Sequence, residues 1–235
     1  MTMQVAILAG GLARRLGLLT ENKPKSMVLV QGRPFLEYQL ELLKRNGIAD
    51  IVLCIGHLGD QIKSHFTDGR DFGVNISYSP EDKPLGTAGA LRNAEGILDD
   101  EFFTLYGDSY LHLDFGAAMS YFKGKNKPAL MSVYKNSDRY GKSNTLVEGD
   151  LVRKFSKRDR TVDMVCIEYG ANIFQKRVLE MIPQNEPYSL DELFPRLIEQ
   201  GELLAYEVKE RFYEIGSPRG LREFERYILS EEASQ

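Results

Sequence analysis

Short apolar runs and helical patterns alternate along the first half of the chain, and this alternation constrains the fold more than any other feature. The runs at residues 5–9, 51–55 and 102–106 are almost continuously apolar. Runs of this length predict strands that are buried on both faces of a parallel sheet. Between the first two runs, residues 34–46 carry apolar side chains at helical spacing, and Gly47 suits the end of a helix.

Four strand–helix repeats of this kind predict an α/β fold: a Rossmann-like, doubly wound, mostly parallel sheet with right-handed crossovers. Sheets of this type bind ligands at the carboxyl ends of their strands. The elements expected in this half are strands at 5–9, 51–55, 74–78 and 102–106, and helices at 34–46, at 60–66 and from Thr87.

The rhythm changes after residue 125. Ser189 and Glu192 have the spacing of a capping box, which predicts a helix that continues to Gln200. The turn at 148–150 separates two strand-like segments and predicts a hairpin. The elements expected here are strands at 129–134 and 165–174, the hairpin at 144–155, the capped helix and a last helix from Pro218 to about 229.

The charge balance excludes the strongly basic class of nucleic-acid-binding proteins. Lys and Arg number 30 and Asp and Glu number 34, which gives a net charge of −4. The apolar N-terminal stretch 1–11 is too short to span a membrane and lacks a basic region before it. We therefore expect a cytoplasmic protein without nucleic-acid or membrane partners, in which Cys54 and Cys166 are buried and reduced.

The first strand ends in Leu8, Ala9, Gly10 and Gly11, a pattern that allows close approach of a phosphate chain. Glycines after a buried strand let backbone N–H groups face an anion. Arg15 and Lys25 follow, and such cations neutralise phosphate charge. The segment is neither a P-loop nor a GxGxxG motif. A glycine-rich turn with solvated basic residues is the alternative interpretation.

A second segment, 78–91, combines a carboxylate with a helix start made of small residues. Gly86 and Thr87 open the helix, where a flat base could lie against the backbone. A tightly packed helix start is the alternative. Glu81 precedes Gly86 by five residues, and a carboxylate only accepts hydrogen bonds. Guanine offers N–H donors at N1 and N2, and uracil offers one at N3. A Glu81 side chain that faces this edge of the base therefore favours GTP or UTP.

Asp108 follows Gly107 at the end of the fourth strand. A carboxylate at a strand end suits a magnesium ion, since Mg²⁺ prefers oxygen ligands, and a turn residue is the alternative. Glu214 precedes Gly216 and Ser217, where the residues alone indicate an exposed side chain before a capped helix.

Together these motifs resemble those of the sugar-1-phosphate nucleotidyltransferases, or sugar-nucleotide pyrophosphorylases, over residues 5 to about 227. The segment Pro-Leu-Gly-Thr-Ala-Gly-Ala at 84–90 is especially similar. In length and motif, the chain is most similar to D-glycero-α-D-manno-heptose 1-phosphate guanylyltransferases, and N-acetylmuramate 1-phosphate uridylyltransferases are similar too. The first motif matches the family at Gly10, Gly11, Arg15, Leu16, Leu19, Thr20, Pro24 and Lys25, and departs from it at Ala13, Arg14 and Leu18.

The resemblance implies a single domain, 1–235, with a nucleotide-binding part at about 1–125 and a small sugar-binding lobe at about 126–235. It implies that the substrates are a nucleoside triphosphate and a sugar 1-phosphate and that the cofactor is Mg²⁺. It is also compatible with a homo-oligomer. The implied roles are catalysis for Arg15, Lys25 and Asp108, nucleotide binding for Leu8, Ala9, Gly10, Gly11, Glu81, Gly86 and Thr87, metal binding for Asp108 and Glu214, and contact with the sugar phosphate for Lys157, Gly170 and Asn172.

Besides a uridylyltransferase, two other functions stay open for this chain. The departures at Ala13 and Glu214 allow a catalytically silent regulatory homologue. A cytidylyltransferase for choline phosphate or a phosphonate is the other, and the segment at 84–91 argues against it because sugar-specific enzymes carry that sequence.

Overall fold

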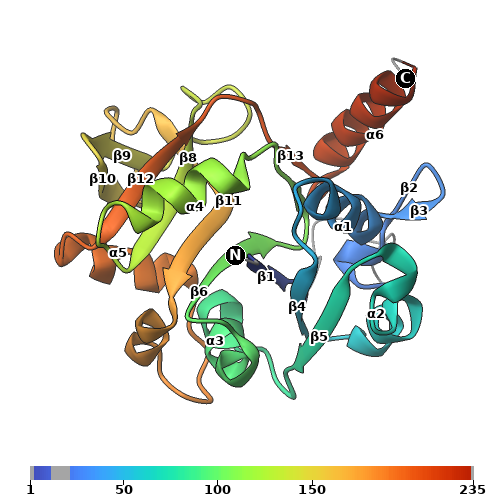
Figure 1. The fold of residues 1–235 in the computed structure, drawn as a ribbon. Coiled ribbons are helices and arrows are strands. Elements are labelled where there is room, and N and C mark those ends of the chain that lie inside the picture. The colour runs from blue at the N-terminus through green and yellow to red at the C-terminus, as the bar shows by residue number, and fades with distance from the viewer. Residues whose placement is uncertain (1–2, 12–21, 234–235) are drawn as a thin grey trace.

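The computed structural model describes residues 3–11 and 22–233, and its strands form one nine-stranded sheet with the order β5-β4-β1-β6-β11-β8-β12-β10-β9 (Figure 1). The first four of these strands are parallel to one another. The predicted Rossmann-like, mostly parallel sheet is thereby confirmed. The strands of the sheet are β1 (Gln4–Leu8), β4 (Asp50–Ile55), β5 (Asn75–Pro80), β6 (Glu101–Tyr106), β8 (Ala129–Lys135), β9 (Thr145–Glu148), β10 (Leu151–Phe155), β11 (Cys166–Gln175) and β12 (Leu203–Val208).

The second half of the chain extends this sheet with mixed strand directions. β11 is antiparallel to both β6 and β8, β12 is parallel to β8, and β10 is antiparallel to β12 and β9. The sheet therefore runs without a break across the boundary that was expected near residue 125. Two short pairs stand apart from it: β2 (Leu29–Val30) with β3 (Arg33–Pro34), and β7 (Ser109–Tyr110) with β13 (Tyr213–Glu214).

Helices cover both faces of the sheet, and the two apolar clusters show which helix lies on which face. Residues of α1, α2 and α4 pack into one cluster, and residues of α3, α5 and η5 pack into the other. A last helix, α6, packs its inner side against α1 and β7 in a third cluster. The helices are α1 (Phe35–Arg45), α2 (Gly59–Phe66), α3 (Gly86–Asn93), α4 (Phe115–Lys123), α5 (Leu190–Glu199) and α6 (Pro218–Glu232), with short 3-10 turns η2 (Lys25–Met27), η3 (Arg70–Phe72), η4 (Glu95–Ile97) and η5 (Lys176–Met181).

The expected elements are present with small shifts at their ends. The sequence patterns had not indicated α4, β12 or the short pairs β2–β3 and β7–β13. Cys54 and Cys166 are buried free thiols, as expected. Among the described helices, none combines the length and the apolar character that a bilayer span requires.

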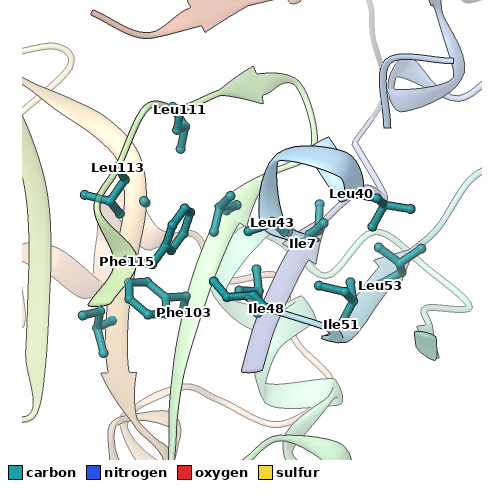
Figure 2. Packing of buried hydrophobic residues seen from close by; sticks show 14 of the residues in the cluster. Ile7, Leu40, Leu43, Ile48, Ile51, Leu53, Phe103, Leu111, Leu113 and Phe115 are labelled. Carbon is teal, nitrogen blue, oxygen red and sulfur yellow. The ribbon is translucent and has the colours of Figure 1, made fainter. Parts of the chain in front are cut away.

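Two buried phenylalanines of the first cluster meet between β6 and the first residue of α4. Figure 2 shows Phe103 beside Phe115, and their ring centroids lie 5.1 Å apart in an edge-to-face arrangement. Both side chains are about 1% exposed. Close packing of this kind fixes β6, whose last residues carry the chain to Asp108.

We expect Phe103→Ala to lower the free energy of unfolding by about 3–5 kcal/mol, because it removes buried apolar surface and leaves a cavity. The measurement is urea unfolding followed by circular dichroism. Leu29→Ala is the control, since Leu29 is 46% exposed and its truncation should change stability by less than about 0.5 kcal/mol. Equal losses in the two variants would contradict this description of the core.

Candidate active site

A cavity of about 870 Å³ opens at the carboxyl ends of β1, β4 and β6. This is the edge at which a doubly wound sheet binds its ligands. The cavity is also lined by His57, which follows β4, and by Tyr106, the last residue of β6. Of the residues predicted for the nucleotide and for catalysis, those that line it are Leu8, Ala9, Gly10, Gly11, Lys25, Glu81, Gly86, Thr87 and Asp108.

Arg15 belongs to residues 12–21, which lie outside the described part of the chain. The departures from the family pattern at Ala13, Arg14 and Leu18 fall in the same segment. Their contribution to the site stays a prediction from the sequence.

One end of the cavity holds the carboxylate of Glu81 against two glycines. A Cβ atom on Gly10 would lie 3.0 Å from Glu81 Oε1, and one on Gly56 would lie 2.6 Å from it. A larger residue at Gly56 would therefore displace the carboxylate. Glu81 Oε2 accepts a hydrogen bond of 3.2 Å from the Leu85 backbone N–H. Burial raises the pKa of Glu81, and the Leu85 N–H lowers it in part.

The first residues of α3 both line the cavity and pack against the chain before α5. The backbone N–H groups of Ala88 and Gly89 donate to the Tyr188 carbonyl at 3.0 and 2.9 Å. The hydroxyl of Thr87 accepts a hydrogen bond of 2.8 Å from the Leu190 N–H at the first turn of α5. The small residues of this segment thus allow α3 to pack closely on the chain before α5, while Gly86 and Thr87 also line the cavity.

Lys25, Asp108 and Glu214 converge over Gly216, and of these three side chains Lys25 and Asp108 line the cavity. A Cβ atom on Gly216 would lie 2.6 Å from Lys25 Nζ, 2.8 Å from Glu214 Oε2 and 2.9 Å from Asp108 Oδ2. Lys25 and Asp108 form an ion pair. The glycine leaves room for three charged groups that come from distant parts of the sequence.

The backbone brings Glu214 to this point through a very short strand pair. In the β7–β13 pair, Glu214 lies opposite Ser109, and the Ile215 N–H donates to the Asp108 carbonyl at 2.9 Å. The side chain is aimed by Ser217, whose hydroxyl donates to Glu214 Oε1 at 2.5 Å. Ser217 also caps α6 by accepting from the Gly220 N–H.

The two carboxylates fit a magnesium ion that takes its other ligands from phosphate and water, because Mg²⁺ is commonly held by one or two carboxylates together with substrate phosphates. Within residues 3–11 and 22–233, no group of three or more His, Cys, Asp or Glu side chains is arranged to hold a metal ion. The oxygen donors of Asp108 and Glu214 thus suit a cation that arrives with a phosphate ligand.

The residues expected to contact a sugar phosphate gather around Tyr106. Lys157 Nζ lies 6.0 Å from the centre of the Tyr106 ring and forms an ion pair of 2.8 Å with Asp191. Gly170 has a φ of +103°, which favours glycine, and lies at an irregularity of β11 between Glu168 and Asn172. Asn172 is 1% exposed.

A buried carboxylate that the sequence analysis did not single out lies at the centre of this group. Glu168 is 9% exposed, and its Oε1 accepts a hydrogen bond of 3.2 Å from Asn172 Nδ2. The Tyr106 hydroxyl also donates to it. Burial raises the pKa of Glu168, whereas Lys157, Asn172 and Tyr106 lower it. An acidic residue inside the apolar run 166–174 was the available signal, because Glu is almost never fully buried without a partner.

Comparison with known proteins identifies the family to which the chain is similar. The profile of the family described as nucleotidyl transferase matches residues 4–231. The chain is 31% identical to a UTP–glucose-1-phosphate uridylyltransferase of Synechocystis, over 85% of this chain and 56% of that protein, so it spans little more than half of that relative. It is 30% identical to the D-glycero-α-D-manno-heptose 1-phosphate guanylyltransferase of Campylobacter jejuni, over 94% of this chain and 98% of that one. The crystal structure of HddC from Yersinia pseudotuberculosis complexed with GMP-PN has a TM-score of 0.82 and 26% identity, and covers 97% of this chain and 100% of that one.

The raised pKa of Glu168 predicts how Glu168→Gln changes the pH dependence of stability. A carboxyl group whose pKa is higher in the folded state stabilises the fold below its unfolded pKa of about 4.3, and this contribution is lost as the pH rises through the folded value. Relative to the wild type, the Gln variant should therefore gain stability as the pH rises from 4.3. Urea unfolding at a series of pH values measures this difference, and a constant difference would contradict the raised pKa.

Proposed function

Because the chain belongs to the nucleotidyl transferase family, we propose that it transfers a nucleoside monophosphate from a nucleoside triphosphate to a sugar 1-phosphate and releases pyrophosphate. The observation that carries this proposal is the convergence of Lys25, Asp108 and Glu214 over Gly216. Two members of this cluster, Lys25 and Asp108, line the same cavity as Glu81 and Tyr106.

The chemistry that these residues must perform is dominated by charge. The phosphate of the sugar attacks the α-phosphorus of the triphosphate, so two anions must be aligned against their repulsion. Lys25 neutralises phosphate charge near the α-phosphorus, and Lys157 orients the incoming sugar phosphate. For the segment outside the described residues, we propose that Arg15 stabilises the transferred phosphate and the departing pyrophosphate.

Asp108 and Glu214 are proposed to hold magnesium. When bound, Mg²⁺ supplies positive charge that offsets the repulsion between the two substrates. The sugar phosphate is already ionised at neutral pH, so the reaction needs no histidine as a base. The ion pair between Lys25 and Asp108 compensates the charges of both side chains.

We propose GTP as the preferred nucleotide. Glu81 faces the cavity as a half-buried carboxylate, and its two oxygens can accept from both N–H donors of guanine. Uracil offers one such donor, and the corresponding edges of cytosine and adenine place an acceptor beside a donor. The relative from Yersinia pseudotuberculosis, whose structure was solved with GMP-PN, is consistent with guanine. The uridylyltransferase from Synechocystis keeps UTP as the second candidate.

For the acceptor we propose a heptose 1-phosphate. The relative from Campylobacter jejuni that acts on this substrate aligns over almost the full length of both chains. Glu168 offers a buried hydrogen-bond acceptor beside Lys157, which suits a polyhydroxylated sugar whose phosphate contacts the lysine.

The experiment that tests the function is a matrix of the four nucleoside triphosphates against a panel of sugar 1-phosphates, read by release of pyrophosphate. We expect GTP first, UTP second, and CTP and ATP poorer than both, with a heptose 1-phosphate as the best acceptor. A protein that releases no pyrophosphate with any pair would support a silent regulatory homologue instead.

The same assay tests the role of Glu81. Glu81→Gln replaces one acceptor oxygen with a donor, so it should weaken GTP use and narrow the gap to CTP. One lost charge-assisted hydrogen bond costs about 1.5–3 kcal/mol, which predicts a fall in kcat/KM for GTP of roughly 10- to 150-fold. An unchanged ranking of the four nucleotides would remove Glu81 from base selection.

The cluster over Gly216 yields a second test. In Gly216→Ala the added Cβ would displace Lys25, Glu214 or Asp108, and loss of such electrostatic groups lowers turnover on the order of 10²-fold. Asp108→Asn should lower turnover similarly. The control is Gly96→Ala, where an added Cβ meets no atom within 4 Å and turnover should be retained. Wild-type turnover of Gly216→Ala at saturating magnesium would contradict the assignment.

A further inference from the structure

Arg211 lies in a stack of planar groups immediately before Glu214. The guanidinium carbon lies 4.0 Å from the centre of the Tyr140 ring and 4.3 Å from the centre of the Tyr213 ring. The Tyr213 ring in turn stacks on Tyr227, with 4.4 Å between centroids and 25° between planes. Contacts between a guanidinium and an aromatic face are favourable, more so when they are partly shielded from water.

This stack joins three segments that are distant in the sequence. Tyr140 belongs to the loop 136–144 between β8 and β9, Tyr213 belongs to β13, and Tyr227 belongs to α6. Arg211 also donates to Glu223 of α6 through Nη2, at 2.7 Å. One side chain thus holds the loop and the helix against the strand that carries Glu214.

The strand β13 needs such support because it consists of only two residues, Tyr213 and Glu214. Its partner β7 is equally short, and an isolated pair of this length has little stability of its own. Glu214 is further aimed by Ser217 at the start of α6. The position of the Glu214 carboxylate therefore depends on how firmly β13 and α6 are held together.

The loop at the other side of the stack is well ordered by its own hydrogen bonds. The Asn136 side chain donates to the Gly141 carbonyl at 2.9 Å and accepts from the Tyr140 N–H at 2.9 Å. At the end of the loop, Asn144 accepts from the backbone N–H of Glu168 at 2.9 Å. Tyr140 is thus presented by a loop that is anchored beside the buried carboxylate of the sugar-binding side.

We propose that Arg211 is a positioning residue for the magnesium site: it holds β13 between the loop 136–144 and α6, so that the Glu214 carboxylate stays beside Asp108. This inference rests on the proposed role of Glu214 as a magnesium ligand. It predicts that loss of the stack weakens metal binding before any chemical step takes place.

The test measures Mn²⁺ binding by electron paramagnetic resonance, in the presence of a GTP analogue with a methylene bridge between the α- and β-phosphorus atoms. Arg211→Ala and Tyr140→Ala should each weaken Mn²⁺ binding, by up to about tenfold, as expected for a shielded cation–π contact. Tyr140→Phe keeps the aromatic face and should bind like the wild type. Arg211→Lys keeps the charge but not the planar group, and should be weakened.

A double-mutant cycle adds a measurement that a general loss of folding would not reproduce. If the two side chains act through one stack, Tyr140→Ala should have little further effect in the Arg211→Ala background. Lys125→Ala is the control: Lys125 lies 5.3 Å from the Tyr121 ring and pairs with Asp150 at 2.6 Å, among residues without a proposed role in the site. It should leave Mn²⁺ binding unchanged.

Two outcomes separate this inference from the function on which it rests. Wild-type Mn²⁺ affinity in Arg211→Ala and Tyr140→Ala would overturn the positioning role alone. A wild-type protein that binds no Mn²⁺ together with the analogue would overturn the metal assignment of Glu214, and the positioning role with it.

Discussion

The hydrogen-bond ladders on both sides of β1 are the interaction on which the rest of the molecule depends. Leu8, the last residue of this strand, lies opposite Cys54 of β4 and opposite Tyr106 of β6. Three parallel strands therefore end at one level, and the chain leaves each of them at the same edge. The glycines after β1, Gly56 after β4 and Asp108 after β6 are brought to one cavity by this common register rather than by contacts of their own.

Around that cavity the charges are arranged in two different ways. Where phosphate groups are proposed to lie, Lys25 and Lys157 are paired with Asp108 and Asp191, so each cation has a partner that an incoming anion can replace. Where specificity is proposed to lie, Glu81 and Glu168 are shielded carboxylates held by N–H and O–H donors. A buried acceptor left without a donor costs free energy, which is the physical basis of the specificity proposed for these two groups. Arg211 acts on neither set directly, and its proposed task is to keep Glu214 in place.

The local patterns of the sequence predicted most of the first half of the fold, because each parallel strand is a short apolar run and each helix has its own periodicity. They did not indicate α4, which is short and has a glycine near its start although its buried residues share one face, or β12, whose short run resembles other buried segments. The cavity-lining glycines, Glu81 and Asp108 could be predicted because they belong to contiguous motifs at strand ends. The acidic residue Glu168 stands out within an apolar run, but its role could not be assigned from the sequence, since its partner Tyr106 comes from another strand. The convergence of Glu214 with Lys25 likewise depends on tertiary contacts of β13.

The hydrogen bonds between the starts of α3 and α5 have a consequence for how the two substrates meet. Amide groups of α3 are bound to the Tyr188 carbonyl, and the first amide of α5 is bound to the Thr87 hydroxyl. α3 begins at the cavity, and α5 carries Asp191, the partner of Lys157. The distance between the cavity and the Lys157–Asp191 pair is therefore fixed as the protein folds. If the two substrates bind as proposed, this fixed distance is a steric limit, so that substrate length as well as hydrogen bonding would govern what the protein accepts.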